Sequence, residues 1–338
     1  MEFSKEQLEI IEAPIDEKTI VMAAAASGKT RVLIERLKYV IDHGVDPSRI
    51  VVLTFTNNAA AEMRDRLGID IMPGMFMGTI HSYANYLLTS HGYNTAMIRD
   101  EEAFDELFDM IEENPEVLRP VDYLLCDESQ DLNPAQFNFI SEVLDPTASL
   151  IVGDVRQSIY GFRGAEPKML LKLMRKDDYV IRQLTQNYRN TSRIISLANK
   201  IISKMKNVPD TKVVGMRHEA GKVQVIGPFD ILQTIKKDPV WGNWAILCRT
   251  NKKVDSIMSM LTRQGIPCIT FRQAEGSIDD LKEKLNENAV KVLTIHSSKG
   301  LEFNKVIVCD TFSKGQDNIR LNYVAVTRAR DELYLVGK

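Results

Sequence analysis

The stretch Ala23–Thr30 reads AAAASGKT, and it lies between an apolar run, Thr19–Ala23, and a helical pattern. A Gly-Lys-Thr sequence at a strand-to-helix turn is typical of a phosphate-binding loop, in which backbone N–H groups and the helix dipole attract phosphate oxygens. In such a loop Lys29 would reach the β- and γ-phosphates, and the hydroxyl of Thr30 would hold Mg²⁺. Ala23 stands where the general pattern has its first glycine, so an alanine-rich turn without phosphate chemistry is the alternative.

Short apolar runs alternate with helical patterns along the 338 residues. Such runs are typical of parallel strands that are covered on both faces. The predicted strands are Thr19–Ala23, Ile50–Thr54, Tyr123–Asp127, Ser149–Gly153, Trp244–Arg249, Val290–Ile295, Lys305–Asp310 and Glu332–Gly337, and the clearest helices are Gly28–His43 and Asn58–Leu67. The pattern predicts an α/β protein with two tandem units, 1–176 and 177–338.

The composition limits the classes of protein that the chain can represent. A net charge of -3 means that any nucleic-acid surface must be local. The cysteines form no CxxC pair, which argues against a zinc or iron–sulfur site and favours reduced thiols. No apolar run reaches the length of a membrane span, and the first residues form no basic apolar leader. We therefore expect no membrane partner and a cytoplasmic location.

The segment Glu101–Glu116 contains eight acidic residues and no basic one. Its apolar residues Phe104, Leu107, Phe108 and Ile111 follow helical spacing, so we expect an amphipathic helix with an acidic outer face. A solvated face is the simpler interpretation, and a docking face for a partner is the alternative.

Two more predicted strands end in residues suited to phosphate chemistry. Asp127 and Glu128 follow one strand, and the carboxyl ends of parallel strands are where ligands bind. Asp127 can reach Mg²⁺, directly or through water, and Glu128 can polarise the attacking water as general base. Gln157 follows the next strand, and its amide can contact the γ-phosphate and orient water. Alone these residues would be solvated strand ends or a polar turn, but beside a phosphate-binding loop they predict one site.

These segments and several others resemble superfamily 1 DNA helicases of the UvrD/Rep/PcrA type over nearly the whole chain. The matching motifs, in order, are Phe3–Ile11 (FSKEQLEII), Thr54–Met63 (TFTNNAAAEM), Gly78–Ser82 (GTIHS), Asp127–Asp131 (DESQD), Gln157–Ala165 (QSIYGFRGA), Gln186–Arg189 (QNYR), Thr294–Phe303 (TIHSSKGLEF) and Val326–Ala329 (VTRA). Their order argues against a chance match. The resemblance implies two tandem RecA-like P-loop domains, parallel sheets flanked by helices, an ATP site in the cleft between the domains, and ATP with Mg²⁺ as cofactors.

The resemblance implies a role at ATP for each matching residue. Gln7 would contact adenine, although its position also fits a capping box at a helix start. Arg189 and Arg328 would stabilise the transferred phosphoryl group and make closure of the domains depend on the γ-phosphate. Tyr188 would stack on adenine, and Glu302 would accept a hydrogen bond from the ribose. The remaining ATP contacts fall on the phosphate loop, at Ala25, Ala26, Ser27, Gly28, Lys29, Thr30 and Arg31.

The resemblance also implies a path for single-stranded DNA. The aromatic residues Phe55, Tyr160 and Phe162 match base-stacking positions, and stacking tolerates any base. Packing in the core is the alternative for each ring. The residues expected at phosphates or sugars are Thr79, His81, Arg163 and His296, and Thr56 and Asn57 belong to the first DNA-contact motif. Because backbone contacts do not read sequence, we expect little sequence preference and strong salt dependence.

The chain departs from larger relatives in two connections and in the phosphate loop. The connection between His81 and Asp127 is too short for the whole of subdomain 1B, so we expect a reduced helical insert at about 83–120. The connection 272–288 is too short for subdomain 2B. Since these inserts contact duplex in relatives, a protein partner is expected to supply the duplex contacts. Ala26 replaces a family glycine, and slow ATP turnover would follow if that position needs a positive φ.

Three functions compete at this point. The first is an ATP-dependent translocase or helicase of 3′–5′ polarity on single-stranded DNA or 3′-tailed duplex, in a bacterial or phage-infected cell. The second is a DNA-binding or regulatory module that binds ATP with weak turnover. The third is an RNA-directed relative, because the motifs do not read the 2′-hydroxyl. Against the second function stands a complete catalytic set, namely Lys29, Asp127, Glu128, Gln157, Arg189 and Arg328.

Overall fold

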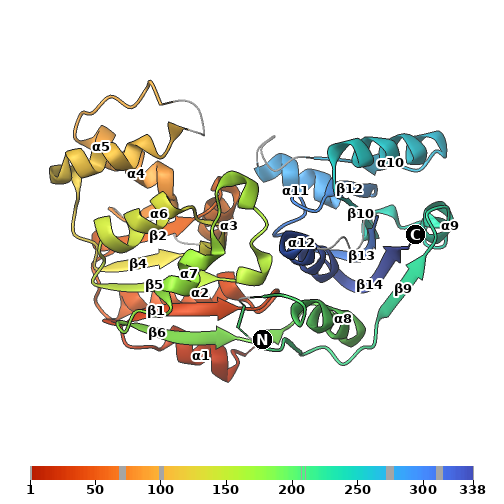
Figure 1. The fold of residues 1–338 in the computed structure, drawn as a ribbon, viewed down its shortest axis with the longest axis horizontal. Helices are drawn as coiled ribbons and strands as arrows, with labels where there is room; N and C mark the ends of the chain where they lie inside the picture. Colours follow the sequence, from red (N-terminus) through yellow and green to blue (C-terminus); the bar gives the residue numbers. More distant parts are fainter. Residues whose placement is uncertain are drawn as a thin grey trace. The chain divides into compact units, whose positions relative to one another are not determined.

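The computed structural model describes residues 2–67, 74–98, 103–206, 208–209, 211–271, 278–309 and 315–337. The chain forms two compact units, unit 1 (Met1–Leu184) and unit 2 (Thr185–Lys338). Each unit contains one six-stranded sheet (Figure 1). Every strand pair in the described ranges is parallel. The predicted α/β class with two tandem parallel sheets is therefore confirmed.

The sheet of unit 1 has the strand order β3-β2-β4-β5-β1-β6. Its strands are β1 (Lys18–Ala23), β2 (Ile50–Thr54), β3 (Phe76–Thr79), β4 (Tyr123–Cys126), β5 (Ala148–Gly153) and β6 (Tyr179–Leu184). The four inner strands coincide with the predicted runs. The edge strands β3 and β6 lie outside them, because β6 (YVIRQL) contains the polar Arg182 and Gln183 and β3 (FMGT) has only two apolar residues. Since β6 pairs with β1, unit 1 ends at Leu184 rather than at residue 176.

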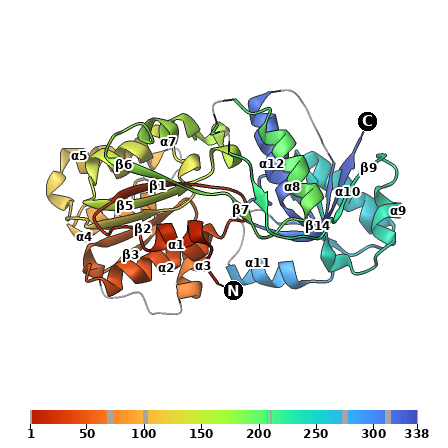
Figure 2. The ribbon, with the colours of Figure 1, turned by 90° about the horizontal axis from the view of Figure 1, so that it is seen from below.

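Helices cover both faces of this sheet (Figure 2). Helices α1 (Lys5–Ile11), α2 (Lys29–Asp42) and α3 (Asn57–Leu67) share one apolar core with the strands, and α7 (Pro167–Leu173) lies on the opposite face. Helix α4 (Ile80–Ser90) follows β3 and packs on α5 (Glu106–Glu113). The predicted acidic helix corresponds to α5 and begins later than expected, at Glu106. The short elements around them are η1 (Pro47–Arg49), η3 (Pro115–Val117), η4 (Ser129–Asp131), α6 (Pro134–Asn138), η5 (Phe139–Val143), η6 (Val155–Gln157) and η7 (Gly161–Arg163).

The sheet of unit 2 has the order β11-β12-β10-β13-β14-β9. Helices α8 and α12 lie side by side in Figures 1 and 2, and α9 and α10 share a core with the strands. No helix in the described part of the chain is long and apolar enough to cross a membrane. The elements are β7 (Gln186–Asn187), α8 (Ser192–Ile202), β8 (Val214–Gly215), β9 (Lys222–Ile226), α9 (Ile231–Lys236), η8 (Trp241–Asn243), β10 (Trp244–Cys248), α10 (Asn251–Arg263), β11 (Cys268–Ile269), α11 (Ile278–Asn286), β12 (Val290–Thr294), β13 (Phe303–Val308), α12 (Gln316–Thr327) and β14 (Ala329–Val336).

Three neighbouring strands of unit 1 bring the phosphate-site candidates together at their carboxyl ends. Strand β5 lies between β4 and β1, and all three run in the same direction. Their carboxyl ends lead into the phosphate loop, into Asp127 and Glu128, and into Asp154. The sheet topology therefore explains how segments far apart in the sequence can form one site.

Candidate functional site

The phosphate loop joins the end of β1 to the first residue of α2, Lys29. Gly28 caps the helix with φ 83°, a left-handed conformation that favours glycine. A Cβ at this position would lie 2.8 Å from Nε2 of Gln7, so the space also requires glycine. Because the first turn of a helix leaves its N–H groups unpaired, the loop presents donors and a positive dipole to an anion.

Ala26 has φ 55° and is therefore in the left-handed region as well. A residue with a Cβ is strained there, which meets the condition under which the sequence predicts slow turnover. The hydroxyl of the next residue, Ser27, is buried and has no hydrogen-bond partner among the described residues. A buried, unpaired hydroxyl in this loop suits a ligand that accepts hydrogen bonds.

Gln7 forms the capping box that the sequence offered as one of its two roles. Its Oε1 accepts from the backbone N–H of Ser4 at 3.0 Å, and its own backbone N–H donates to the Ser4 hydroxyl at 3.3 Å. Its Nε2 donates to the carbonyl of Ser27 at 3.0 Å. The buried amide thus braces the phosphate loop from α1, while its contact with adenine stays a prediction.

The side chain of Lys29 points to the acidic ends of the neighbouring strands. Its Nζ lies 2.9 Å from Oε1 of Glu128. Burial opposes the charged form of Lys29, but the carboxylates of Glu128, Asp127 and Asp154 outweigh it and hold the lysine pKa above its ordinary value. Lys29 is therefore a permanent cation at neutral pH, paired with the proposed base.

A buried glutamine, Gln130, connects the strand ends. Its Nε2 donates to Oε2 of Glu128 and, at 3.1 Å, to Oδ2 of Asp131. Its Oε1 accepts from the backbone N–H of Asp154 at 2.8 Å. The carboxylate of Asp154 in turn accepts from Nε2 of Gln157 at 2.9 Å. One chain of hydrogen bonds within unit 1 therefore holds both Glu128 and Gln157 in position.

The residues of unit 1 fit a magnesium-bound triphosphate. The loop N–H groups, the unpaired Ser27 hydroxyl and the Lys29 ammonium are donors for phosphate oxygens. Thr30 and Asp127 are the oxygen ligands that would hold Mg²⁺. In the described ranges no three His, Cys, Asp or Glu side chains gather around a common metal position.

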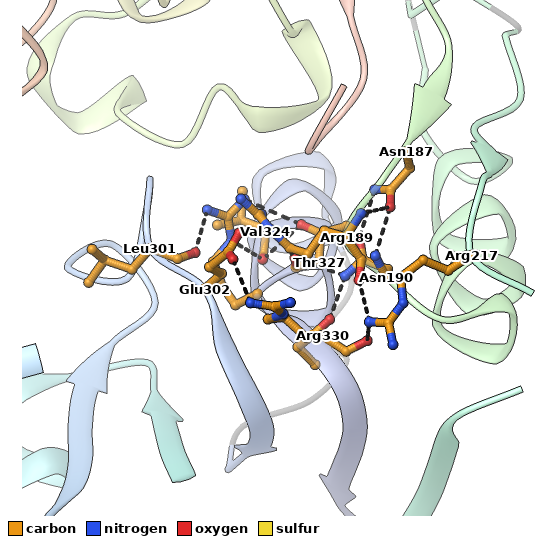
Figure 3. A network of polar contacts seen from close by, with 11 residues as sticks. Asn187, Arg189, Asn190, Arg217, Leu301, Glu302, Val324, Thr327 and Arg330 are labelled. Atoms are coloured by element: carbon orange, nitrogen blue, oxygen red, sulfur yellow. Dashed lines mark hydrogen bonds and ion pairs between the residues drawn. The ribbon is translucent and has the colours of Figure 1, made fainter. Parts of the chain in front are cut away.

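Both arginines that the sequence predicts at the nucleotide, Arg189 and Arg328, belong to unit 2, and Figure 3 shows the polar network around Arg189. Nε of Arg189 donates to Glu302 at 2.5 Å, and Nη1 of Arg330 donates to the other oxygen of the same carboxylate at 3.3 Å. Arg328 is 3% exposed, and its guanidinium donates to the carbonyls of Val324 and Leu301, both at 3.1 Å. Arg189 and Arg328 thus lie in the same cluster, Glu302 is paired with Arg189 and Arg330, and the roles of these residues at ATP stay predictions.

The other residues expected at the nucleotide have local partners. The hydroxyl of half-buried Tyr188 donates to Oε1 of Gln186 at 2.5 Å. The guanidinium of Arg31 lies over the ring of Phe3, 3.9 Å from its centroid. Both side chains are held in place within their own unit, and their contacts with ATP stay predictions.

The three aromatic candidates for DNA stacking form a cluster in unit 1. The rings of Phe55 and Tyr160 stack at 5.4 Å between centroids, and Tyr160 and Phe162 lie at 6.0 Å. Phe162 is 70% exposed whereas Tyr160 is 6% exposed. The ring of Phe162 is therefore largely exposed to solvent, Phe55 is half-buried, and Tyr160 mainly packs between them.

Several polar candidates for DNA contact have roles within the fold. The Thr79 side chain caps α4, and the Thr56 hydroxyl accepts from the N–H of Ala59 near the start of α3. His81 lies 3.0 Å from Oδ1 of Asp105, and its ring stacks on Phe108. The histidine thus faces the acidic insert. Asn57 is exposed and His296, in unit 2, is half-buried, whereas the side chain of Arg163 lies outside the described residues.

Family models match both units. A model of the UvrD/REP helicase N-terminal domain matches residues 3–116 and 107–178. Two models of the UvrD-like helicase C-terminal domain match residues 182–277 and 289–336. The N-terminal match alone spans more than half of the chain. The chain belongs to the UvrD/REP helicase family.

Curated relatives agree with this membership. A "Probable DNA helicase" of Mycoplasma pneumoniae is 26% identical over 444 residues, which cover 94% of this chain and 80% of the relative. A "Putative ATP-dependent DNA helicase" of Acanthamoeba polyphaga mimivirus is 28% identical over 98% of this chain and 53% of the relative. The "ATP-dependent DNA helicase PcrA" of Staphylococcus epidermidis is 29% identical over 73% and 48%, respectively.

The chain spans about half the length of the last two relatives. The alignment with the mycoplasma protein is longer than the 338 residues of this chain, so that relative has segments that this chain lacks. This UvrD/REP family member is therefore a minimal form. In unit 1 the reduced insert consists of the end of α4, α5 and the 3₁₀ turn η3 within the described ranges.

Some residues of this UvrD/REP family member that shape the site received no role from the sequence. They are Gln130 and Asp154 in unit 1 and Asn187, Asn190, Arg217 and Arg330 in unit 2. Gln130 and Asn187 lie inside quoted motifs, and Asn190 and Arg330 directly follow two of them, which is the signal that could have drawn attention to these residues. The partners of Gln130, Asn190, Arg217 and Arg330 are distant in sequence, so the local pattern does not show their roles.

Proposed function

We propose that this chain is an ATP-dependent translocase on single-stranded DNA with 3′–5′ polarity. The observation that carries the proposal is the grouping of Lys29 with Glu128, Asp127 and Asp154 at the phosphate loop. Family membership supports ATP and DNA as ligands, and the names of the relatives support helicase activity. The polarity comes from the family resemblance. A cytoplasmic location is part of the same proposal, because DNA and ATP must both be available.

In the proposed reaction, unit 1 binds the triphosphate and activates water. The loop N–H groups and Lys29 neutralise phosphate charge, and Glu128 takes a proton from the attacking water. Mg²⁺, held by Thr30 and Asp127, would add charge stabilisation at the phosphate oxygens. Because Glu128 accepts hydrogen bonds from Lys29 and Gln130, its carboxylate is fixed in position before substrate binds.

We further propose that Arg189 and Arg328 of unit 2 act on the triphosphate held by unit 1. Fixed guanidinium charge stabilises the transferred phosphoryl group, and losing the γ-phosphate removes what attracts the arginines. Binding and hydrolysis would then close and open the two units in turn, which moves the DNA track. Gln157 would sense the γ-phosphate next to the loop that carries Tyr160 and Phe162.

For DNA, the proposal assigns stacking first to Phe162, because its ring is exposed, and then to Phe55. Unwinding of duplex is proposed to need a protein partner, since the chain is shorter than its helicase relatives within the aligned region. Robust unwinding of a 3′-tailed duplex by the purified chain would contradict this part.

The test is the rate of ATP hydrolysis with and without single-stranded DNA, for the wild type and Lys29→Ala. Stimulation by DNA that the substitution abolishes is the expected result, and single-stranded RNA in the same assay tests the choice of nucleic acid. A near-zero rate with and without DNA, together with tight ATP binding, would contradict the motor. That result would favour the second candidate, a regulatory ATP-binding module, for which the strained Ala26 is the supporting observation.

A further inference from the structure

Two buried asparagines in unit 2 join the segments that carry Arg189 and Arg328. Asn187 and Asn190 are both fully buried. Nδ2 of Asn187 donates to Oδ1 of Asn190 at 2.6 Å. Oδ1 of Asn187 accepts from the backbone N–H groups of Arg189, at 3.0 Å, and of Asn190, at 2.8 Å. The amide of Asn187 therefore shapes the turn on which Arg189 stands.

The side-chain amide nitrogen of Asn190 contacts the backbone on either side of Arg328. Nδ2 of Asn190 donates to the carbonyls of Thr327, at 3.1 Å, and of Ala329, at 2.5 Å. These two carbonyls flank Arg328 directly in the sequence. Asn190 thus holds the backbone on both sides of Arg328, and Figure 3 shows it between the turn of Arg189 and the end of α12.

Arg217 ties the same two segments from a second point. Its Nη1 donates to the carbonyl of Arg189 at 2.8 Å and to that of Arg330 at 3.4 Å. Its Nη2 pairs with Asp331 at 2.8 Å. Burial acts against the charged form of Arg217, but the hydrogen bonds that its guanidinium donates to Asp331 and Glu219 raise its pKa. Arg217 therefore stays charged and keeps its hydrogen bonds to the carbonyls of Arg189 and Arg330.

We propose that Asn190 is a positioning residue that makes Arg189 and Arg328 one rigid pair. This rests on the proposed function, in which both arginines act on one phosphoryl group. Two guanidinium groups on separate segments would each need to be ordered at every turnover, and ordering them beforehand removes that cost. An amide is suited to this task because it donates two hydrogen bonds while accepting one from Asn187.

The test is a double-mutant cycle on DNA-stimulated ATP hydrolysis with Asn190→Ala and Arg328→Ala. In the wild-type background, Asn190→Ala is expected to lower kcat by about tenfold to a hundredfold with KM for ATP changed less than about threefold. In the Arg328→Ala background the same substitution is expected to lower kcat by less than about threefold, because the arginine through which it acts is gone.

A matched control is Asn199→Ala. Asn199, on α8 of the same unit, also holds backbone through its amide, with two hydrogen bonds of 2.9 Å to Val213. It contacts neither arginine, so it should change kcat less than about twofold even if it lowers the melting temperature. Equal losses of kcat from Asn190→Ala with and without Arg328, or a loss from Asn199→Ala as large, would overturn the proposal.

The milder variant Asn190→Ser keeps the test decisive if Asn190→Ala does not fold. A serine hydroxyl donates one hydrogen bond and can reach one carbonyl, so a kcat between those of the wild type and the alanine variant is expected. A serine variant with wild-type kcat would contradict the positioning role of Asn190. The failure of the proposed function is a different result, since a wild type without DNA-stimulated hydrolysis would show it before any variant is compared.

Discussion

Replacing Ala26 with glycine should relieve strain in the phosphate loop. Ala26 has φ 55°, and a residue with a Cβ loses roughly 1–2 kcal/mol in the left-handed region. The greater freedom of glycine in the unfolded chain offsets about 0.4–1 kcal/mol of this. We therefore expect Ala26→Gly to raise the free energy of unfolding of unit 1 by about 0.5–1 kcal/mol, a shift in melting temperature of a few degrees.

The neighbouring Ala25 is the matched control, because it is buried and is not among the described residues with positive φ. Ala25→Gly should destabilise unit 1 by about 1 kcal/mol, since a buried methyl group is lost and the unfolded chain gains freedom. Urea denaturation followed by far-ultraviolet circular dichroism measures both variants. Both tryptophans, Trp241 and Trp244, are in unit 2, so their fluorescence gives a separate readout of that unit.

Relief of strain should also appear in catalysis if the loop keeps this conformation when ATP is bound. Ala26→Gly is then expected to hydrolyse ATP at least as fast as the wild type. A glycine variant that is less stable than the wild type by as much as Ala25→Gly would refute the reasoning, because it would mean that the left-handed conformation of Ala26 carries no strain.

Three further predictions concern the fold, its pH dependence and the DNA track. Arg36 is buried and donates to the carbonyls of Ile11, Ala13 and Pro14, so Arg36→Met should destabilise unit 1 by about 3 kcal/mol or more in urea denaturation. An equal effect of Lys38→Met, at a half-buried lysine of the same helix, would contradict this. Burial acts to raise the pKa of Glu17, but hydrogen bonds from Arg182 and Thr19 outweigh burial and lower it. The ionised Glu17 therefore stabilises the fold fully above its unfolded pKa of about 4.3, and this stabilisation is lost as the pH falls through the folded pKa. Arg182→Gln should reduce the dependence of the free energy of unfolding on pH in the acid range, and an unchanged dependence would argue against the Arg182–Glu17 pair. Phe162→Ala should weaken single-stranded DNA binding by about 1–3 kcal/mol without changing the salt dependence of binding or the melting temperature, whereas Tyr160→Ala should lower the melting temperature. Fluorescence anisotropy titrations at several salt concentrations would measure the binding. Unchanged affinity in Phe162→Ala would refute the stacking role.

The inner strands and the phosphate loop could be predicted because their signals are local. Strand β2 begins and ends where its apolar run does, since a strand buried on both faces needs apolar residues at every position. Gly28 and Lys29 are recognisable because the loop needs a left-handed turn and a cation within a few residues. The edge strand β6 (YVIRQL) could not be predicted in this way, because its four middle residues are not buried and include the polar Arg182 and Gln183.

Roles that depend on tertiary contacts could not be predicted from the pattern. The sequence offered two roles for Gln7, and only the fold shows that its amide also braces Ser27 from α1. Asn190 is the residue directly after the QNYR motif and is not part of it, and its partners Thr327 and Ala329 are far away in the chain. His81 was expected at DNA, and its pairing with Asp105 depends on how the insert folds back on α4.

The proposed motor requires that the phosphate site of unit 1 and the arginines of unit 2 serve the same ATP molecule. The most direct measurement is DNA-stimulated ATP hydrolysis by Arg189→Ala, compared with Lys29→Ala and with the wild type. The account predicts that Arg189→Ala binds single-stranded DNA normally but hydrolyses ATP about 10³-fold more slowly or worse. Hydrolysis by Arg189→Ala at the wild-type rate would contradict it.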